Sequence, residues 1–269
     1  MNNEHEKKDL IMSVISNYTW EVVKPFFLSL EKSEFAGEVV LFIENIDEHT
    51  QKILKDLKLD MNLIPFQRVR LENIFNICDY RHYLYLNFLE SNSHCYNNVL
   101  LTDVRDVYFQ INPFHAHWSE NCITVAKEPK KINDDLWNTR WILNKFGYHI
   151  YAQIQDNIAI CAGTTYGPAS QILNYLKDMV YHLFYNINYL PSMINDQAVH
   201  NFLVYTGKIN PISFSDNVNG PIMTLNLERK IKVNKERKQV LLKNGTVAPI
   251  LHQYDRHPKI VNLIRNLCN

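Results

Sequence analysis

Hydrophobic and polar positions in the first part of the chain form blocks that switch between two periodicities. Continuous apolar runs typical of buried strands occur at residues 10–15, 38–43, 61–66 and 99–101. Apolar residues spaced three and four positions apart predict amphipathic helices at residues 20–30, 49–57 and 79–90. Strands that alternate with helices in this way favour parallel βαβ units, so we expect an α/β fold.

The second half of the chain has a less regular pattern. It predicts one buried strand, residues 158–163, which ends at a glycine, and two helices, residues 170–184 and 195–205. The dipeptide Asn244-Gly245 lies between two apolar segments, 239–242 and 246–250, and indicates a β-hairpin. A last helix is expected to begin near Pro258. Because the sequence has no internal repeat and no flexible linker, we expect a single compact domain over residues 1–269.

Composition excludes several classes of protein. Hydrophobic residues make up 46% and charged residues 21% of the chain, as in ordinary globular proteins. Lys+Arg and Asp+Glu are balanced at 28 each, so no overall field favours nucleic acid. The five cysteines form no C-x-x-C pair, which favours reduced thiols and a cytoplasmic location. The start of the chain is polar, unlike a signal peptide, and no apolar run reaches the roughly 18 residues of a transmembrane helix. We therefore expect at most peripheral membrane contact.

The strongest chemical signal is Asp103-Val-Arg-Asp106, which directly follows the predicted strand at 99–101. Two carboxylates at the carboxyl end of a buried strand lie where open α/β sheets bind ligands. Oxygen ligands of this kind suit Mg²⁺ or Mn²⁺. The alternative is an acidic turn that caps the next segment, with Arg105 as a local ion-pair partner.

Other candidate residues have a structural and a functional interpretation. His252, followed by Asp255 and Arg256, could complete a metal site, or the segment could cap the helix that begins near Pro258. Asp196 could cap a helix, bind a hydroxyl group or act as a general base. Arg81 could be a surface arginine or a clamp on a diphosphate.

The order of these segments resembles the nucleotide-sugar-dependent glycosyltransferases of the GT-A fold, in particular the glycogenin-like and bacterial lipopolysaccharide transferases. Those enzymes have a D-x-D motif, an N-A-G strand, a D-Q helix and a C-terminal H-F-x-G metal ligand. The corresponding segments here, within residues 10–258, are Asp103-Val-Arg-Asp106, Cys161-Ala162-Gly163, Asp196-Gln197 and His252. Arg105 stands where D-x-D has its second acid, Cys161 replaces the asparagine, and Gln253-Tyr254 replaces the phenylalanine. The chain therefore resembles a divergent branch.

The resemblance implies a single GT-A type domain with a Rossmann-like mixed sheet flanked by helices. Its nucleotide-binding half would be residues 9–110 and its acceptor-binding half residues 111–269. Mn²⁺ or Mg²⁺ would be held by Asp103, Asp106 and His252. The nucleotide-sugar donor, UDP-linked by resemblance, would be bound by residues from several segments: Ser16, Asn17, Arg81, Arg105 and Arg256.

In the same scheme Asp196 would be the catalytic residue, contacting donor or acceptor hydroxyls or acting as a base. The acceptor would be a glycan, a lipid-linked molecule or a protein, recognised by residues 109–118 and the basic stretch near Lys230. Two alternatives remain at this point. One is a non-catalytic protein of the same fold that binds nucleotide sugars or glycans. The other is a nucleotidyltransferase, although its usual Gly-rich basic loop is not present at Ser16-Asn17-Tyr18.

Overall fold

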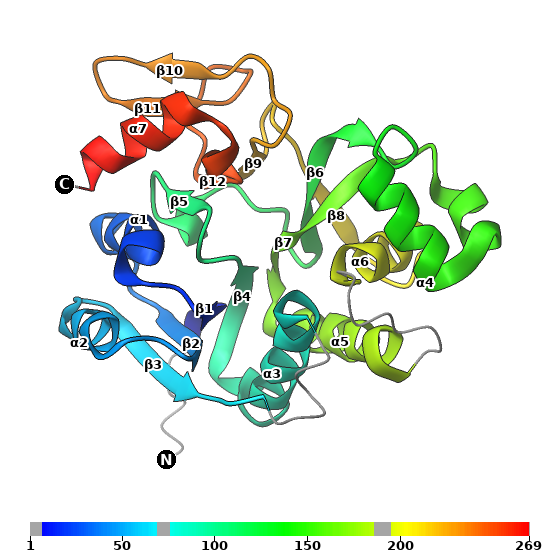
Figure 1. Ribbon diagram of the computed structural model, residues 1–269, viewed down its shortest axis with the longest axis horizontal. Helices are drawn as coiled ribbons and strands as arrows, with labels where there is room; N and C mark the ends of the chain where they lie inside the picture. Colours follow the sequence, from blue (N-terminus) through cyan, green and yellow to red (C-terminus); the bar gives the residue numbers. More distant parts are fainter. Residues whose placement is uncertain (1–6, 69–75, 186–194, 269) are drawn as a thin grey trace.

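A seven-stranded mixed sheet forms the centre of the protein in the computed structural model, which describes residues 7–68, 76–185 and 195–268 (Figure 1). The strand order is β3-β2-β1-β4-β7-β6-β8. The strands are β1 (Lys8–Ser16), β2 (Glu38–Glu44), β3 (Asp60–Pro65), β4 (Tyr96–Thr102), β6 (Ile123–Lys131), β7 (Ile158–Pro168) and β8 (Ile212–Ser215). Strands β3, β2, β1 and β4 are parallel, β7 is antiparallel to β4 and β6, and β8 is parallel to β6. The predicted α/β fold with a mixed sheet is confirmed.

Helices cover both faces of this sheet. On one face lie α1 (Trp20–Lys32) and α2 (Glu48–Asp56). On the other face lie α3 (Ile77–Asn92), α5 (Ala169–Val180) and α6 (Asp196–Tyr205), and α4 (Leu136–Ile154) packs against α6. A short π-helical turn, Tyr181–Tyr185, follows α5.

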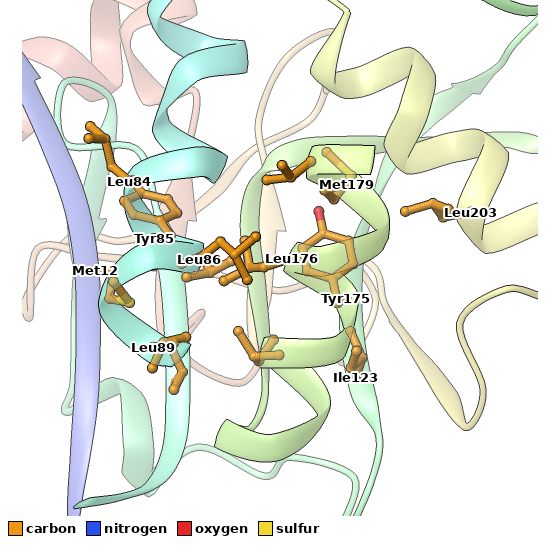
Figure 2. Packing of buried hydrophobic residues seen from close by; sticks show 14 of the residues in the cluster. Met12, Leu84, Tyr85, Leu86, Leu89, Ile123, Tyr175, Leu176, Met179 and Leu203 are labelled. Atoms are coloured by element: carbon orange, nitrogen blue, oxygen red, sulfur yellow. The ribbon is translucent and has the colours of Figure 1, made fainter. Parts of the chain in front are cut away.

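Strand β1 shows why the sequence pattern of the sheet is continuous rather than alternating. Leu10 and Met12 belong to the core beneath α3, whereas Ile11 and Ile15 belong to the core beneath α1. Figure 2 shows Met12 beside Tyr85 of α3. A strand that is buried on both faces needs apolar residues at successive positions, and this produces the unbroken run at residues 10–15.

The C-terminal part of the chain forms a smaller lobe beyond the carboxyl end of β4 (Figure 1). Its three-stranded sheet has the order β5-β12-β9. The elements are β5 (Val107–Phe109), β9 (Ile222–Thr224), β10 (Lys232–Asn234), β11 (Gln239–Leu241), β12 (Ile250–His252) and α7 (Pro258–Leu267). Strands β10 and β11 form a separate antiparallel hairpin. Helix α7 shares a hydrophobic cluster with the three-stranded sheet and with β11.

Several sequence-based expectations about the second half were wrong or incomplete. The turn at Asn244-Gly245 exists, but its flanking segments share a single bridge, Leu241 to Val247. Instead, β11 pairs with β10, and β12 pairs with β5 and β9. Strand β7 continues past Gly163 to Pro168. Strand β6 and helix α4 were not predicted. Among the described residues, no helix has the length and apolar character required to cross a membrane.

Candidate active site

A cleft of about 320 Å³ opens at the carboxyl ends of β1 and β4. In the sheet β1 lies between β2 and β4. The chain adds β2 and β3 on one side of β1 and then β4 on the other side, so the direction of strand addition reverses at β1. In open α/β sheets such a switch point leaves a crevice that binds ligands. The lining combines residues of β1, the segment that follows it, the first turns of α3, the segment after β4 and the segment before α7: Ser13, Val14, Ser16, Tyr18, Ile77, Cys78, Arg81, Asp103, Val104, Arg105, Asp106 and Arg256.

The structure brings Asp103, Asp106 and His252 together: the two acids line this cleft, and His252 is buried behind them and does not line it. Asp103 follows the last residue of β4, and Asp106 directly precedes β5. Strand β12 pairs with β5 so that His252 lies opposite Val107, the neighbour of Asp106. His252 Nε2 lies 3.5 Å from Asp103 Oδ2 and 3.9 Å from Asp106 Oδ1. One potential ligand atom from each residue lies within 4.8 Å of the other two, which is close enough to surround one metal ion.

Two features of the site indicate that it is built to hold a cation and is not ordinary closed core packing. The imidazole of His252 is fully buried, yet neither ring nitrogen has a hydrogen-bond partner. A buried polar atom without a partner is costly, so a ligand at this position would remove that cost. In addition, a Cβ atom on Gly163 would lie 2.5 Å from His252 Nε2 and 2.6 Å from Asp103 Oδ2. The glycine therefore keeps open the space between these two ligand candidates.

Gly163 lies inside β7, not at its end as the sequence pattern suggested. Its carbonyl oxygen accepts a hydrogen bond of 2.8 Å from the backbone N–H of Asp103. Strand β7 continues to pair with β4 on the far side of the glycine, from Thr164 to Pro168. The glycine is thus required by the close approach of His252 and Asp103 rather than by chain reversal.

Arg81 connects the cleft to helix α6. Its guanidinium group forms ion pairs with Asp103 and, at 2.9 Å, with Asp196, and it also donates to the carbonyl oxygen of Ala162. Arg81 is 8% exposed, so the interpretation as a surface arginine is wrong. A guanidinium fork suits this position because it can hold two carboxylates in a fixed geometry.

Asp196 is held at the start of α6 by a residue that the sequence analysis missed. Asp79, fully buried on α3, accepts hydrogen bonds from the backbone N–H groups of Asn195 and Asp196 and from the side-chain amide of Asn195. Asp196 accepts from Gln197 N through Oδ1 and from Arg81 through Oδ2. Asp79 resembled an ordinary first-turn acid of α3, and nothing in the sequence linked it to α6.

The other two predicted arginines also line the cleft. Arg105 Nη2 lies 3.4 Å from Asp106 Oδ2 and 3.3 Å from Asp255 Oδ2. Arg256 has a side chain that is 51% exposed and lies 3.5 Å from Asp255 Oδ1. Asp255 does not cap α7 as one alternative suggested: the residue at that position is His257, whose side chain forms no cap hydrogen bond.

Ser16 and Asn17 differ in their position. Ser16 lines the cleft and donates a hydrogen bond to Glu44, which is also bound by Arg68. Asn17 is exposed and does not line the cleft; its side chain bonds to Ser16 and Asn45.

Two further residues of the cleft, Tyr18 and Cys78, were not predicted from the sequence. Cys78 lies three residues before Arg81 on the same side of a helix, and this spacing was a usable signal.

The electrostatic environment of the acids follows from burial and from their cationic neighbours. Burial by itself would raise the pKa of Asp103, but the charges of Arg81 and His252 outweigh it and lower the pKa. Burial raises the pKa of Asp106 despite the opposing effect of His252. Burial also raises the pKa of Asp196 to about 7, because Asp79 and Asp103 add to it and Arg81 offsets only a part. Burial also raises the pKa of the Cys78 thiol, to about 12, which favours the protonated thiol over the nucleophilic thiolate.

Comparison with known proteins adds no family assignment. Neither the known protein-family models nor the curated protein sequences include a match to this chain.

Proposed function

We propose that this protein is a metal-dependent glycosyltransferase of the GT-A type. It would transfer a sugar from a nucleotide diphosphate sugar, UDP-linked by resemblance, to a hydroxyl group of a glycan, a lipid-linked molecule or a protein. The observation that carries the proposal is a cluster of two carboxylates and one buried imidazole at the switch point of the sheet, with both carboxylates in a cleft that three arginines also line. Acids, an imidazole and arginines together fit a metal-bound diphosphate.

Asp103, Asp106 and His252 would hold Mn²⁺ or Mg²⁺. Carboxylates suit both ions, and the imidazole is a better ligand for Mn²⁺ than for Mg²⁺. When bound, the ion would neutralise the negative charge that develops on the leaving diphosphate. Gly163 supports this role because any larger residue would enter the space between His252 and Asp103.

Arg105 and Arg256 would bind and orient the diphosphate beside the metal ligands. Arg105 and Arg256 are partly exposed and can reach phosphate oxygens, and both now contact Asp255. Arg81 is buried and would fix the orientation of the Asp103 carboxylate. Fixed charges of this kind stabilise a transition state without reorganisation during the reaction.

Asp196 supports the reaction through Arg81 in this scheme. Both of its carboxylate oxygens already accept hydrogen bonds, and its side chain is 4% exposed. We therefore assign it a positioning role for Arg81, and direct contact with a sugar hydroxyl would require that pairing to change. Ser16 and Tyr18, at the end of β1, are the residues of the cleft best placed to contact the nucleoside.

Calorimetric titration with UDP, in the presence and absence of Mn²⁺, tests the proposal. We expect binding that requires Mn²⁺ in the unmodified protein and in the exposed-site control Asp56→Ala, and loss of that binding in Asp106→Ala. A panel of nucleotide sugars would then identify the donor by its slow hydrolysis. Binding that is independent of the metal, or that Asp106→Ala leaves unchanged, would contradict the proposal.

Two activity assays on the same protein separate the alternatives. Mn²⁺-dependent binding without hydrolysis or transfer from any donor would indicate a non-catalytic protein that binds nucleotide sugars. Release of pyrophosphate from a nucleoside triphosphate and a sugar phosphate would indicate a nucleotidyltransferase.

A further inference from the structure

A second groove, of about 490 Å³, lies at the opposite end of the central sheet from the cleft. It includes Asn97 and Asn98 at the start of β4, whereas Asp103 follows the end of that strand. A strand rises roughly 3.3 Å per residue, so the two sites are separated by about 17 Å along β4. The groove is therefore distinct from the candidate active site.

One wall of the groove is aromatic. Trp118 stacks on Tyr166 with ring centroids 3.8 Å apart and an angle of 10° between the planes, and Phe114 packs against the same tyrosine. The indole N–H of Trp118 donates to the carbonyl oxygen of Pro113, which fixes the orientation of the ring. With one face covered by Tyr166, Trp118 offers its other face or its edge to the groove.

The other wall carries amide and hydroxyl groups and one carboxylate: Asn97, Asn98, Ser119, Glu120 and Asn121. Several are held in place by the protein. The Asn97 and Asn98 amides donate to Lys7 O and Asp9 Oδ1, and Ser119 shares a hydrogen bond of 2.7 Å with Ser213. A wall whose polar groups are fixed in advance loses little entropy when a ligand binds.

The charge of the groove restricts the class of ligand. Among the described residues that line it there is no lysine or arginine, and Glu120 supplies a negative charge. Phosphate groups and other polyanions therefore find no cationic partner here, in contrast to the cleft with its three arginines. Sugar rings have apolar C–H faces that pack on aromatic rings and hydroxyl groups that bond to amides and carboxylates.

We propose that this groove is a non-catalytic binding site for a neutral saccharide. The role of the bound saccharide rests on the proposed function: a glycan acceptor held here would be retained near the enzyme by a part of its chain distant from the reacting end. The binding itself does not depend on that function. Residues 109–118, expected from the sequence to recognise the acceptor, include Phe114, Ala116 and Trp118 of this groove. They would therefore bind a part of the acceptor that lies far from the cleft.

Titration with a panel of neutral oligosaccharides, namely maltoheptaose, cellohexaose, chitohexaose and mannohexaose, tests the proposal by calorimetry and by tryptophan fluorescence. We expect at least one to bind, and Trp118→Ala to weaken that binding about tenfold or more, since a stacked ring is lost. Glu120→Gln, at an exposed position, serves as a second variant that leaves the hydrophobic packing intact and should also weaken binding. Trp137→Ala, a tryptophan on α4 that is 58% exposed, is the matched control and should bind normally.

Asp106→Ala distinguishes this proposal from the proposed function. Saccharide binding that persists in Asp106→Ala and in the presence of saturating UDP and Mn²⁺ would support a separate site, whether or not UDP binding is confirmed. Saccharide binding that is lost in Asp106→Ala, but unchanged in Trp118→Ala and Glu120→Gln, would place the ligand in the cleft and overturn the proposal. Failure of every saccharide in the panel to bind the unmodified protein would also overturn it.

Discussion

Gly163→Ala is the sharpest test of the metal site, because the change adds one carbon atom at a known position. That atom would lie 2.5 Å from His252 Cε1 and Nε2 and 2.6 Å from Asp103 Oδ2. Carbon atoms in ordinary contact are about 3.5–4.0 Å apart, so each neighbour must move by roughly 1 Å. Metal–ligand distances tolerate errors of only about 0.2 Å. The displacement is therefore several times larger than the site can accept.

We expect Gly163→Ala to weaken Mn²⁺ binding by about 100-fold, the upper range for changes next to a metal ligand. Overpacking should also lower the free energy of unfolding by about 1–3 kcal/mol. The electron paramagnetic resonance signal of free Mn²⁺ gives the affinity, and urea denaturation gives the stability. Both are measured on the same folded sample.

Gly167→Ala is the matched control, because this glycine lies in the same strand but away from the site. Its added Cβ atom would meet Ile123 Cγ1 at 3.2 Å and Cys122 O at 3.3 Å, a much milder contact. We expect a small loss of stability and unchanged Mn²⁺ affinity. If folded Gly163→Ala bound Mn²⁺ as tightly as the unmodified protein, Asp103 and His252 would not be ligands of one ion. Equal loss of Mn²⁺ affinity in Gly163→Ala and Gly167→Ala would show that the clash with His252 and Asp103 is not the cause.

Three further predictions concern the network around the cleft. Asp79→Asn should lower the free energy of unfolding by about 2 kcal/mol in urea denaturation, because it replaces an acceptor at the start of α6 with a donor. Arg81→Met should cost about 3 kcal/mol, since the buried carboxylate of Asp196 and the partly buried carboxylate of Asp103 lose their partner, and the added change Asp196→Asn should restore a part of it. Glu44→Gln should cost about 1 kcal/mol at neutral pH: burial opposes ionisation, but bonds from Arg68 and Ser16 lower the pKa of Glu44 below 4.5. This contribution is present above pH 4.5 and is lost as the pH falls through the lowered pKa.

Each of these predictions has its own control. Asp56→Asn, at an exposed position of α2, should leave stability unchanged, and an equal loss there would contradict the argument for Asp79. If Asp196→Asn made Arg81→Met less stable still, an unpaired buried charge at Asp196 would not be the source of the lost stability. A stability difference between Glu44→Gln and the unmodified protein that persisted at pH 3 would show that the ion pair is not its source.

The local elements of the first half could be predicted from the sequence because their signals are local. Strands β1, β2 and β4 are buried on both faces, and α1 and α2 each have one apolar side, so the sequence pattern identifies these elements directly. In the second half, α4 was missed. It has a kink at Gly147, where φ is +77°, and the apolar pattern is interrupted there. The turn at Asn244-Gly245 was predicted and has one antiparallel bridge across it, but a turn signal does not specify that β11 pairs mainly with β10.

By itself, the sequence determined that a buried strand ends at two carboxylates, since that pattern depends only on neighbouring residues. The tertiary structure alone decided what meets those carboxylates. His252 reaches Asp106 through the register of β12 on β5, and Arg81 reaches both Asp103 and Asp196 because the first turns of α3 lie beside the end of β4 and the start of α6. Gly163 acquires its role only when these side chains converge on β7. Such contacts depend on strand register and helix packing between distant segments, and no local pattern of residues encodes them.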